Sequence, residues 1–117
     1  MNLSEYDFKA KCNEEDLSFL ILSTSEGLVL KSSLSEDISE ILSAYISLIY
    51  KESNNLFEKS TKNDKIREIC IKGEENQISI FNFEKNDMML LLISGSKVSK
   101  PIKRKMKKII KEVVRCL

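Results

Sequence analysis

The sequence predicts an α+β domain with the order helix, two strands, long helix, three strands, helix, in which the five strands form an antiparallel sheet. Three observations support this fold class. The chain has 117 residues, of which 42% are apolar and 32% charged, which is typical of a single domain over residues 1–117. Short apolar runs typical of strands alternate with longer segments of helical period. The links between the last three runs are too short for parallel crossovers.

The first elements expected are a short helix and a hairpin. Apolar residues recur at helical spacing within residues 3–13 and favour a short helix there. The apolar run 17–22 is followed by Ser25-Glu26-Gly27 and a second run at 28–30. This pattern predicts two strands joined by a tight turn, with Gly27 supplying the positive φ of that turn.

Residues 35–59 change to a helical period and predict the long helix. Ser35 can cap its N-terminus, and Glu36 and Asp37 place negative charge in its first turn. The large apolar positions cover an arc of about 200°, more than one face of a sheet can bury. Two interpretations follow: the helix has a second partner, or it lies in a groove of its own fold.

Three further strands are expected after the long helix, at residues 66–71, 77–83 and 88–93. They are joined by turns at residues 73–76 and 84–87. The strands around Phe19 and Leu91 are apolar without alternation, which predicts a place in the middle of the sheet with both faces covered. The strands that contain Val29 and Ile69 are more mixed. We therefore expect these two at the edges of the sheet.

The last element expected is a helix that begins near Ser99, which can cap it, with Pro101 in its first turn. Its apolar stripe should dock on the sheet, and its opposite side forms a basic face of Lys103, Arg104, Lys107, Lys108 and Lys111. Residues 97–117 hold nine of the 19 Lys/Arg and one of the 18 Asp/Glu, a net +8. The remaining ten Lys/Arg and seventeen Asp/Glu give residues 1–96 a net charge of −7. An acidic body thus carries a basic C-terminal helix.

Composition argues against an enzyme and against a metal or cofactor site. The chain has no histidine, the commonest general base and metal ligand. Gly95-Ser96-Lys97 lacks the first glycine and the spacing of a phosphate-binding loop, so a turn between strand and helix is expected there. We therefore expect no catalytic residues, no cofactor and no metal.

The cysteines and the apolar runs indicate a cytoplasmic protein. Cys12, Cys70 and Cys116 form no C-x-x-C pair and are expected to be reduced thiols, with Cys70 acting as a small buried residue of its strand. Residues 1–12 lack the apolar core of a signal peptide, and no apolar run is long enough to cross a bilayer.

Residues 17–32, LSFLILSTSEGLVLKS, resemble the opening hairpin of the roadblock family of dynein light chains. Residues 41–48 resemble the long central helix of that family, with its small residues. The resemblance covers about residues 15–117 and rests on the order and lengths of elements. It departs from the family in residues 1–15, after the second strand and in the basic last helix. It implies a layered fold, shared with longin and profilin-like domains, with the long helix on one sheet face and the terminal helices on the other.

The resemblance implies a non-enzymatic module that dimerises and binds or recruits a small Ras-like GTPase, with itself or a roadblock paralogue as the second subunit. In such dimers the third strands pair across a two-fold axis and the long helices pack side by side. The implied dimer-interface residues are Ile41, Ser43, Ala44, Ser47, Leu48, Ile66, Ile69, Cys70 and Ile71. The implied partner surface consists of Ile46, Tyr50, Asn54 and Phe57. One symmetric interface would satisfy both an unpaired edge and a helix with excess apolar surface.

Two other functions compete with this one. A longin-like adaptor subunit of a trafficking or motor complex would cover the long helix with a peptide or a larger subunit. The basic face could instead bind nucleic acid or an anionic membrane. We expect a solvated face, because no aromatic side chain is interleaved with the lysines to stack on bases.

Overall fold

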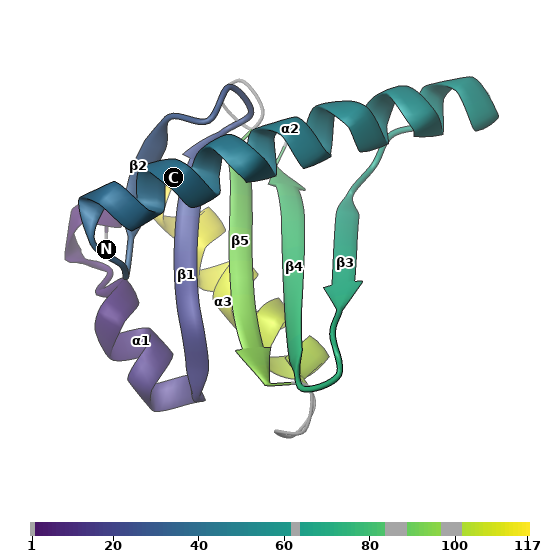
Figure 1. Cartoon of the computed structure of the whole chain (residues 1–117). Coiled ribbons are helices and arrows are strands. Elements are labelled where there is room, and N and C mark those ends of the chain that lie inside the picture. The colour runs from purple at the N-terminus through teal and green to yellow at the C-terminus, as the bar shows by residue number, and fades with distance from the viewer. Residues whose placement is uncertain (1, 62–63, 84–88, 97–101) are drawn as a thin grey trace.

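The structure is a computed structural model that describes residues 2–61, 64–83, 89–96 and 102–117 (Figure 1). Its elements follow the predicted order. They are a 3₁₀ turn (Leu3–Glu5), α1 (Phe8–Glu15), β1 (Leu17–Thr24), β2 (Val29–Ser32), α2 (Glu36–Ser60), β3 (Glu68–Lys72), β4 (Asn76–Phe83), β5 (Met89–Ser96) and α3 (Ile102–Cys116).

The five strands form one antiparallel sheet of order β2-β1-β5-β4-β3, with β1 and β5 in the middle and β2 and β3 at the edges, as predicted. The central pair joins segments far apart in the chain, with Leu20 opposite Ile93 and Leu22 opposite Leu91. Runs that are apolar at every position are stable only where both faces of the sheet are covered. This requirement places β1 and β5 together in the centre.

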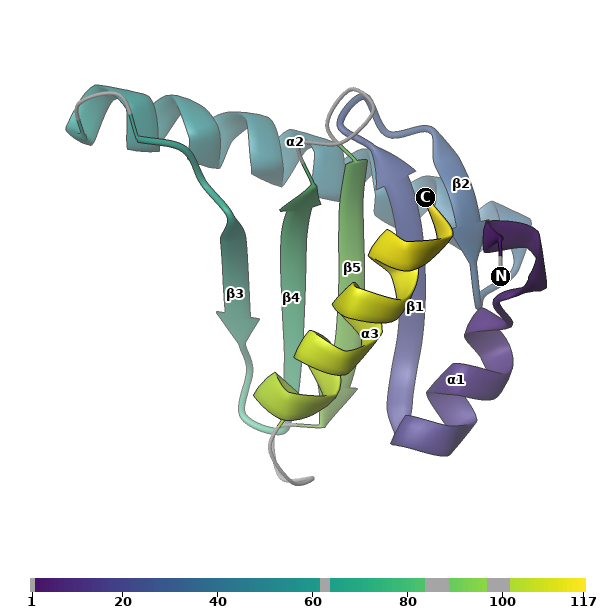
Figure 2. The same ribbon diagram turned by 180° about the vertical axis from the view of Figure 1, so that it is seen from behind.

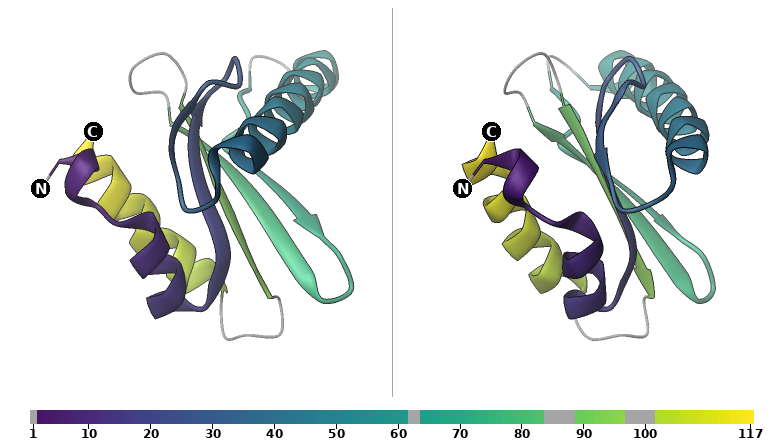
Figure 3. Two further views of the ribbon diagram at one scale, coloured as in Figure 1. Left: turned by 60° about the vertical axis from the view of Figure 1, so that its left-hand side comes forward. Right: turned by 90° about the vertical axis from the view of Figure 1, so that its left-hand side faces the viewer.

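The sheet separates two apolar layers, with α2 on one face and α1 and α3 on the other (Figure 3). Ile46 and Tyr50 of α2 pack on Ile21, Ile80 and the neighbouring strand residues. The opposite layer combines apolar residues of α1, α3 and the other sheet face, among them Phe8, Cys12, Leu20, Leu91, Ile93, Met106, Ile109 and Val113. This is the layered arrangement that the roadblock resemblance implies.

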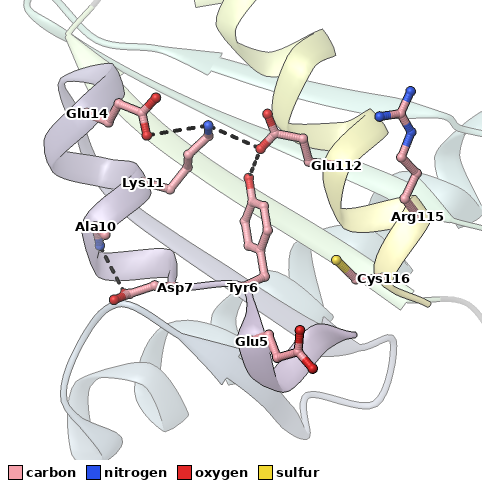
Figure 4. Close-up of a pocket in the computed structure, with 9 residues that line it drawn as sticks. All are labelled: Glu5, Tyr6, Asp7, Ala10, Lys11, Glu14, Glu112, Arg115 and Cys116. Atoms are coloured by element: carbon pink, nitrogen blue, oxygen red, sulfur yellow. Dashed lines mark hydrogen bonds and ion pairs between the residues drawn. The ribbon is translucent and has the colours of Figure 1, made fainter. Parts of the chain in front are cut away.

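Polar contacts join α1 and the segment just before it to α3 (Figure 4). The buried Tyr6 hydroxyl donates to Glu112 Oε2, which also lies 3.2 Å from Lys11 Nζ. Burial, reinforced by Glu112, raises the pKa of the Tyr6 phenol far above its usual value, so the hydroxyl remains a donor. A second contact joins Lys108 Nζ to Glu15 Oε1 at 2.8 Å. One lysine of the predicted basic face is therefore paired within the chain.

Two local predictions are wrong. Gly95 and Ser96 do not form a turn between strand and helix: both lie in β5, and Gly95 pairs with Leu17 and with Gln77. Cys70 is exposed rather than buried. Its strand β3 is at the edge of the sheet, and on the sheet face that carries α3 no helix of the described chain lies over β3. Ser35 does precede α2, although its side chain makes no capping hydrogen bond. The expected turn at 84–87 and the residues Ser99 and Pro101 lie outside the described residues.

None of the helices in the described ranges combines the length and the apolar character needed to cross a membrane.

The contact between Glu15 and Lys108 predicts a pH-dependent contribution to folding. The hydrogen bond from Lys108 lowers the pKa of Glu15 below its ordinary value in the unfolded chain. The contact should therefore stabilise the fold above the ordinary carboxyl pKa and lose this effect as pH falls through the lowered value. In urea unfolding, Lys108→Gln should be less stable than the wild type at about pH 7, and the difference should become smaller as the pH is lowered toward about 3.

Lys107→Gln is the matched control, because Lys107 is an exposed neighbour on α3 without an ion pair to a described residue. Its difference from the wild type should not change with pH over this interval. A Lys108→Gln difference that is equally large at both pH values would contradict the assigned contact.

Candidate interaction surface

A line of large apolar side chains runs along the solvent side of α2. Ile41, Tyr45 and Leu48 are 58%, 63% and 58% exposed, and Ile38 and Leu56 are 50% and 71% exposed. The spacing of three and four residues from Ile38 to Leu48 places these side chains on one side of the helix. We call these five residues the α2 stripe. In one chain, the stripe leaves several large apolar groups in water.

The opposite side of α2 is buried on the sheet. Ile46 and Tyr50 are only 5% and 4% exposed, and the Tyr50 hydroxyl accepts a hydrogen bond of 2.9 Å from Asn82 Nδ2. The wide apolar arc is therefore divided between the sheet and the α2 stripe. The assignment of Ile46 and Tyr50 to a partner surface is wrong, because both belong to the buried half. Asn54 and Phe57 are half-buried.

The small residues of α2 accommodate the turn between β1 and β2. Ser43 and Ser47 are buried, and their hydroxyls donate to the carbonyl oxygens of Gly27 and Ser25 at 2.9 and 2.5 Å. Gly27 has a φ of +92°, and a Cβ there would lie 3.5 Å from Ser43 O. Ser43 and Ser47 are therefore not available to a second helix, contrary to the sequence-based expectation. Ala44, by contrast, is exposed.

The edge strand β3 lies beside the C-terminal half of α2, which extends past it (Figure 1). Ile71 is 44% exposed and Ile69 is half-buried; both share a sheet face with their β4 partners Ile78 and Ile80, which pack in the α2 layer. In the described chain β3 pairs only with β4. Its second edge is open to another strand.

A groove connects this edge strand to α2. It has a volume of about 530 Å³ and is lined by Leu56 and Phe57 of α2, by Ile69 of β3 and by half-buried Ile66. Of the predicted interface residues, the structure thus brings Ile69 and Ile71 to the same side of the sheet as the α2 stripe. Ile66 lines this groove and also a second groove that borders α3. Side chains alternate between the two faces along a strand, so Cys70, between Ile69 and Ile71, lies on the other sheet face, where it is opposite Ser79.

The predicted basic face lies on the side of the sheet opposite α2 (Figure 2). Met106, Ile109 and Val113 of α3 are buried against the sheet, and Arg104, Lys107, Lys108 and Lys111 are exposed. The side chain of Lys103 lies outside the described residues. The molecule therefore carries an apolar surface and a cationic surface on opposite sides.

The described residues include no group of three or more Cys, Asp or Glu side chains placed to hold a metal ion. A pocket between α1 and α3 contains Tyr6, Lys11 and Glu112, which are already paired with one another (Figure 4). Sequence reasoning missed this contact because it joins residues 106 positions apart.

No family model and no curated protein matches the sequence. Solved structures match its fold. A roadblock/LC7 domain from Streptomyces avermitilis is 13% identical, with a TM-score of 0.79 over 98% of this chain and 97% of that one. Myxococcus xanthus MglB is 10% identical, with a TM-score of 0.74 over 91% and 87%. An MglB with a tetrameric arrangement is 14% identical, with a TM-score of 0.73 over 93% and 83%. The chain therefore has the roadblock/LC7 fold.

Tyr45 and Ile46 are adjacent but lie on different sides of α2, so a charge introduced at each should change the folding free energy by very different amounts. Ile46→Lys should cost about 3 kcal/mol or more of folding free energy, because it buries a cation without a partner. Tyr45→Lys should change the folding free energy of one chain by about 0.5 kcal/mol or less, because its side chain lies in water. Urea unfolding at low protein concentration measures both. Equal destabilisation would contradict the division of the helix into two faces.

Proposed function

We propose that this protein is a non-enzymatic dimeric scaffold that binds or recruits a small Ras-like GTPase. The observation that carries the proposal is the open edge of β3 beside the uncovered α2 stripe. Each is a liability in a single chain, since an open edge invites strand pairing and a large apolar patch favours association. A symmetric interface satisfies both, because one contact then serves the two subunits equally.

The proposed dimer pairs the two β3 strands antiparallel across a two-fold axis. Such pairing joins the two sheets into one and keeps α2 of both subunits on the same face. The exposed interface residues are then Ile41, Ala44, Leu48, Cys70 and Ile71, with Tyr45 added and Ser43 and Ser47 removed. Ile66 and Ile69 contribute from half-buried positions in the groove.

The proposed GTPase site is the composite surface that the paired α2 helices create. The GTPase as partner is taken from the roadblock resemblance, and the fold shared with MglB supports it. Asn54 and Phe57 remain candidates for this surface, since both are half-buried. The nucleotide would be held by the GTPase, and this chain would supply apolar contact area. The second subunit is a copy of this chain or a roadblock paralogue.

Light scattering after size exclusion tests the dimer. The wild type should have a mass near 27 kDa, twice the 13.5 kDa of one chain. Ile71→Lys should give a folded 13.5 kDa species, because the substitution places a charge at the pairing strand without filling a buried position. Ile71 is preferable to Ile69, which is half-buried and packs on the α2 layer.

Leu30→Lys is the matched control, since Leu30 is 39% exposed on β2, at the opposite edge of the sheet. It should leave the 27 kDa species intact. A monomeric wild type would overturn the dimer and favour a longin-like adaptor, in which a peptide or a larger subunit covers the α2 stripe.

A binding experiment tests the GTPase. Small GTPases loaded with GDP or a non-hydrolysable GTP analogue should bind the wild-type dimer in one nucleotide state, and Tyr45→Lys should weaken this binding at least about tenfold. Because Tyr45→Lys also affects the proposed helix contact, its mass is measured in parallel. Binding that is unchanged in a dimeric Tyr45→Lys variant would place the GTPase elsewhere.

A further inference from the structure

Helix α3 lies on the side of the sheet away from α2 (Figure 2), and it carries a row of exposed cations. Arg104, Lys107, Lys111 and Arg115 are all exposed, and their spacing of three and four residues aligns them along the helix. At 1.5 Å per residue, the row is about 16 Å long. We call these four residues the cation row. Its position is rigid, because the buried side of α3 is anchored on the sheet through Met106, Ile109 and Val113.

The cation row has no ion-pair partner in the part of the chain that the structure describes. The neighbouring carboxylates are paired with other lysines. Glu15 accepts from Lys108 at 2.8 Å, while Glu112 and Glu14 lie 3.2 and 3.6 Å from Lys11 Nζ. The carboxylates of α1 and α3 that lie nearest to the row are therefore already paired, and the positive charge of the row is available to an external anion.

The surroundings of the row offer charge but no exposed large apolar side chain. The large apolar side chains exposed in the described chain lie on α2, β2, β3 and the turn before β2, and none lies on α1 or α3. Helix α3 also contains no aromatic residue. Protein interfaces draw most of their energy from buried aromatic, apolar or Arg anchors, and single-stranded nucleic acids bind by stacking on aromatic rings. The row supplies Arg104 and Arg115 but has no exposed aromatic or apolar side chain beside them, so it favours a partner that is bound mainly by charge.

A bilayer surface fits the row better than a duplex does. A helix that reads duplex DNA enters a groove and meets phosphates on both flanks. The inner side of α3 is packed on the sheet, and α1 lies on the same sheet face (Figures 2 and 3). The four cations therefore lie on the outer crest of α3. A flat anionic surface meets that crest without steric conflict, and it requires nothing more than charge.

We propose that the cation row binds the anionic headgroups of a lipid bilayer, so that α2 faces away from the membrane. Binding is peripheral and electrostatic, because the apolar side of α3 is occupied by the sheet and cannot insert. This revises the sequence-based expectation of a merely solvated basic face. In the proposed dimer both α3 helices lie on one face of the joined sheet, so two rows meet the same plane. That doubling rests on the proposed function, whereas the row itself belongs to a single chain.

Vesicle co-sedimentation of the full chain tests the proposal. The wild type should sediment with mixed phosphatidylserine and phosphatidylcholine vesicles at about 0.05 M salt, and it should be released at about 0.5 M, where charges are screened within a few ångströms. It should not sediment with pure phosphatidylcholine. Lys107→Glu/Lys111→Glu should bind the anionic vesicles at least about tenfold more weakly.

Two controls separate the row from net charge and from folding. Lys107→Arg/Lys111→Arg keeps the charges and should bind as the wild type does. Lys51→Glu/Lys59→Glu changes the net charge equally on α2 and should retain most of the binding. Circular dichroism verifies that each variant is folded, and light scattering reports its mass, so that loss of the dimer is distinguished from loss of the row.

Three results would overturn the proposal. The first is a wild type that does not bind anionic vesicles at low salt. The second is equal loss of binding in the α2 control and the α3 variant when both keep the wild-type mass. The third is binding to a short DNA duplex at a salt concentration that abolishes vesicle binding, which would assign the row to nucleic acid.

Discussion

The fold depends on one constraint: the two central strands are apolar on both faces and must be covered on both. Leu20 and Leu22 face one layer while Ile21 faces the other, and Leu90 to Ile93 of β5 alternate in the same way, all at 2% exposure or less. A two-layer fold would leave half of these side chains in water. The α2 layer and the α1 and α3 layer both follow from this requirement, as does the separation of the two interaction surfaces by the sheet.

Helix α2 shows how one element can serve an internal and an external surface at once. Its buried side combines Ile46 and Tyr50 with Ser43 and Ser47, whose hydroxyls satisfy two carbonyls of the neighbouring turn. Its outer side carries the α2 stripe. Because the helix spans 25 residues and extends past β3, its own sheet does not cover its far end, where Leu56 is 71% exposed.

The order of elements and the sheet positions were predictable from sequence, because apolar period and loop length report directly on both. The continuous apolar runs around Phe19 and Leu91 identified the central strands, and the mixed strand around Ile69 identified an edge. The side chains of α2 were harder to assign. Helical period shows that Tyr45 and Ile46 point in different directions, but both are large and apolar, so only packing reveals which one the sheet buries.

The small residues were misassigned for a related physical reason. A serine allows close approach of any neighbour, and the sequence does not say whether that neighbour is a second helix or a turn of the same chain. The contacts of Tyr6 with Glu112 and of Lys108 with Glu15 were likewise beyond sequence reasoning, because they depend on how two distant helices cross the same sheet. Acidic and basic residues in different segments have many alternative partners.

The uncovered α2 stripe also has a consequence for how much of this protein a cell can maintain. Any partner that covers the stripe binds the folded chain in preference to the unfolded one, so by mass action the folded population increases with the concentration of that partner. Chains made in excess of their partners keep five large apolar side chains in water and remain prone to aggregation and degradation. Where that partner is a roadblock paralogue rather than a second copy of this chain, the supply of the partner, more than the rate of synthesis of this chain, would set the steady-state amount of this protein.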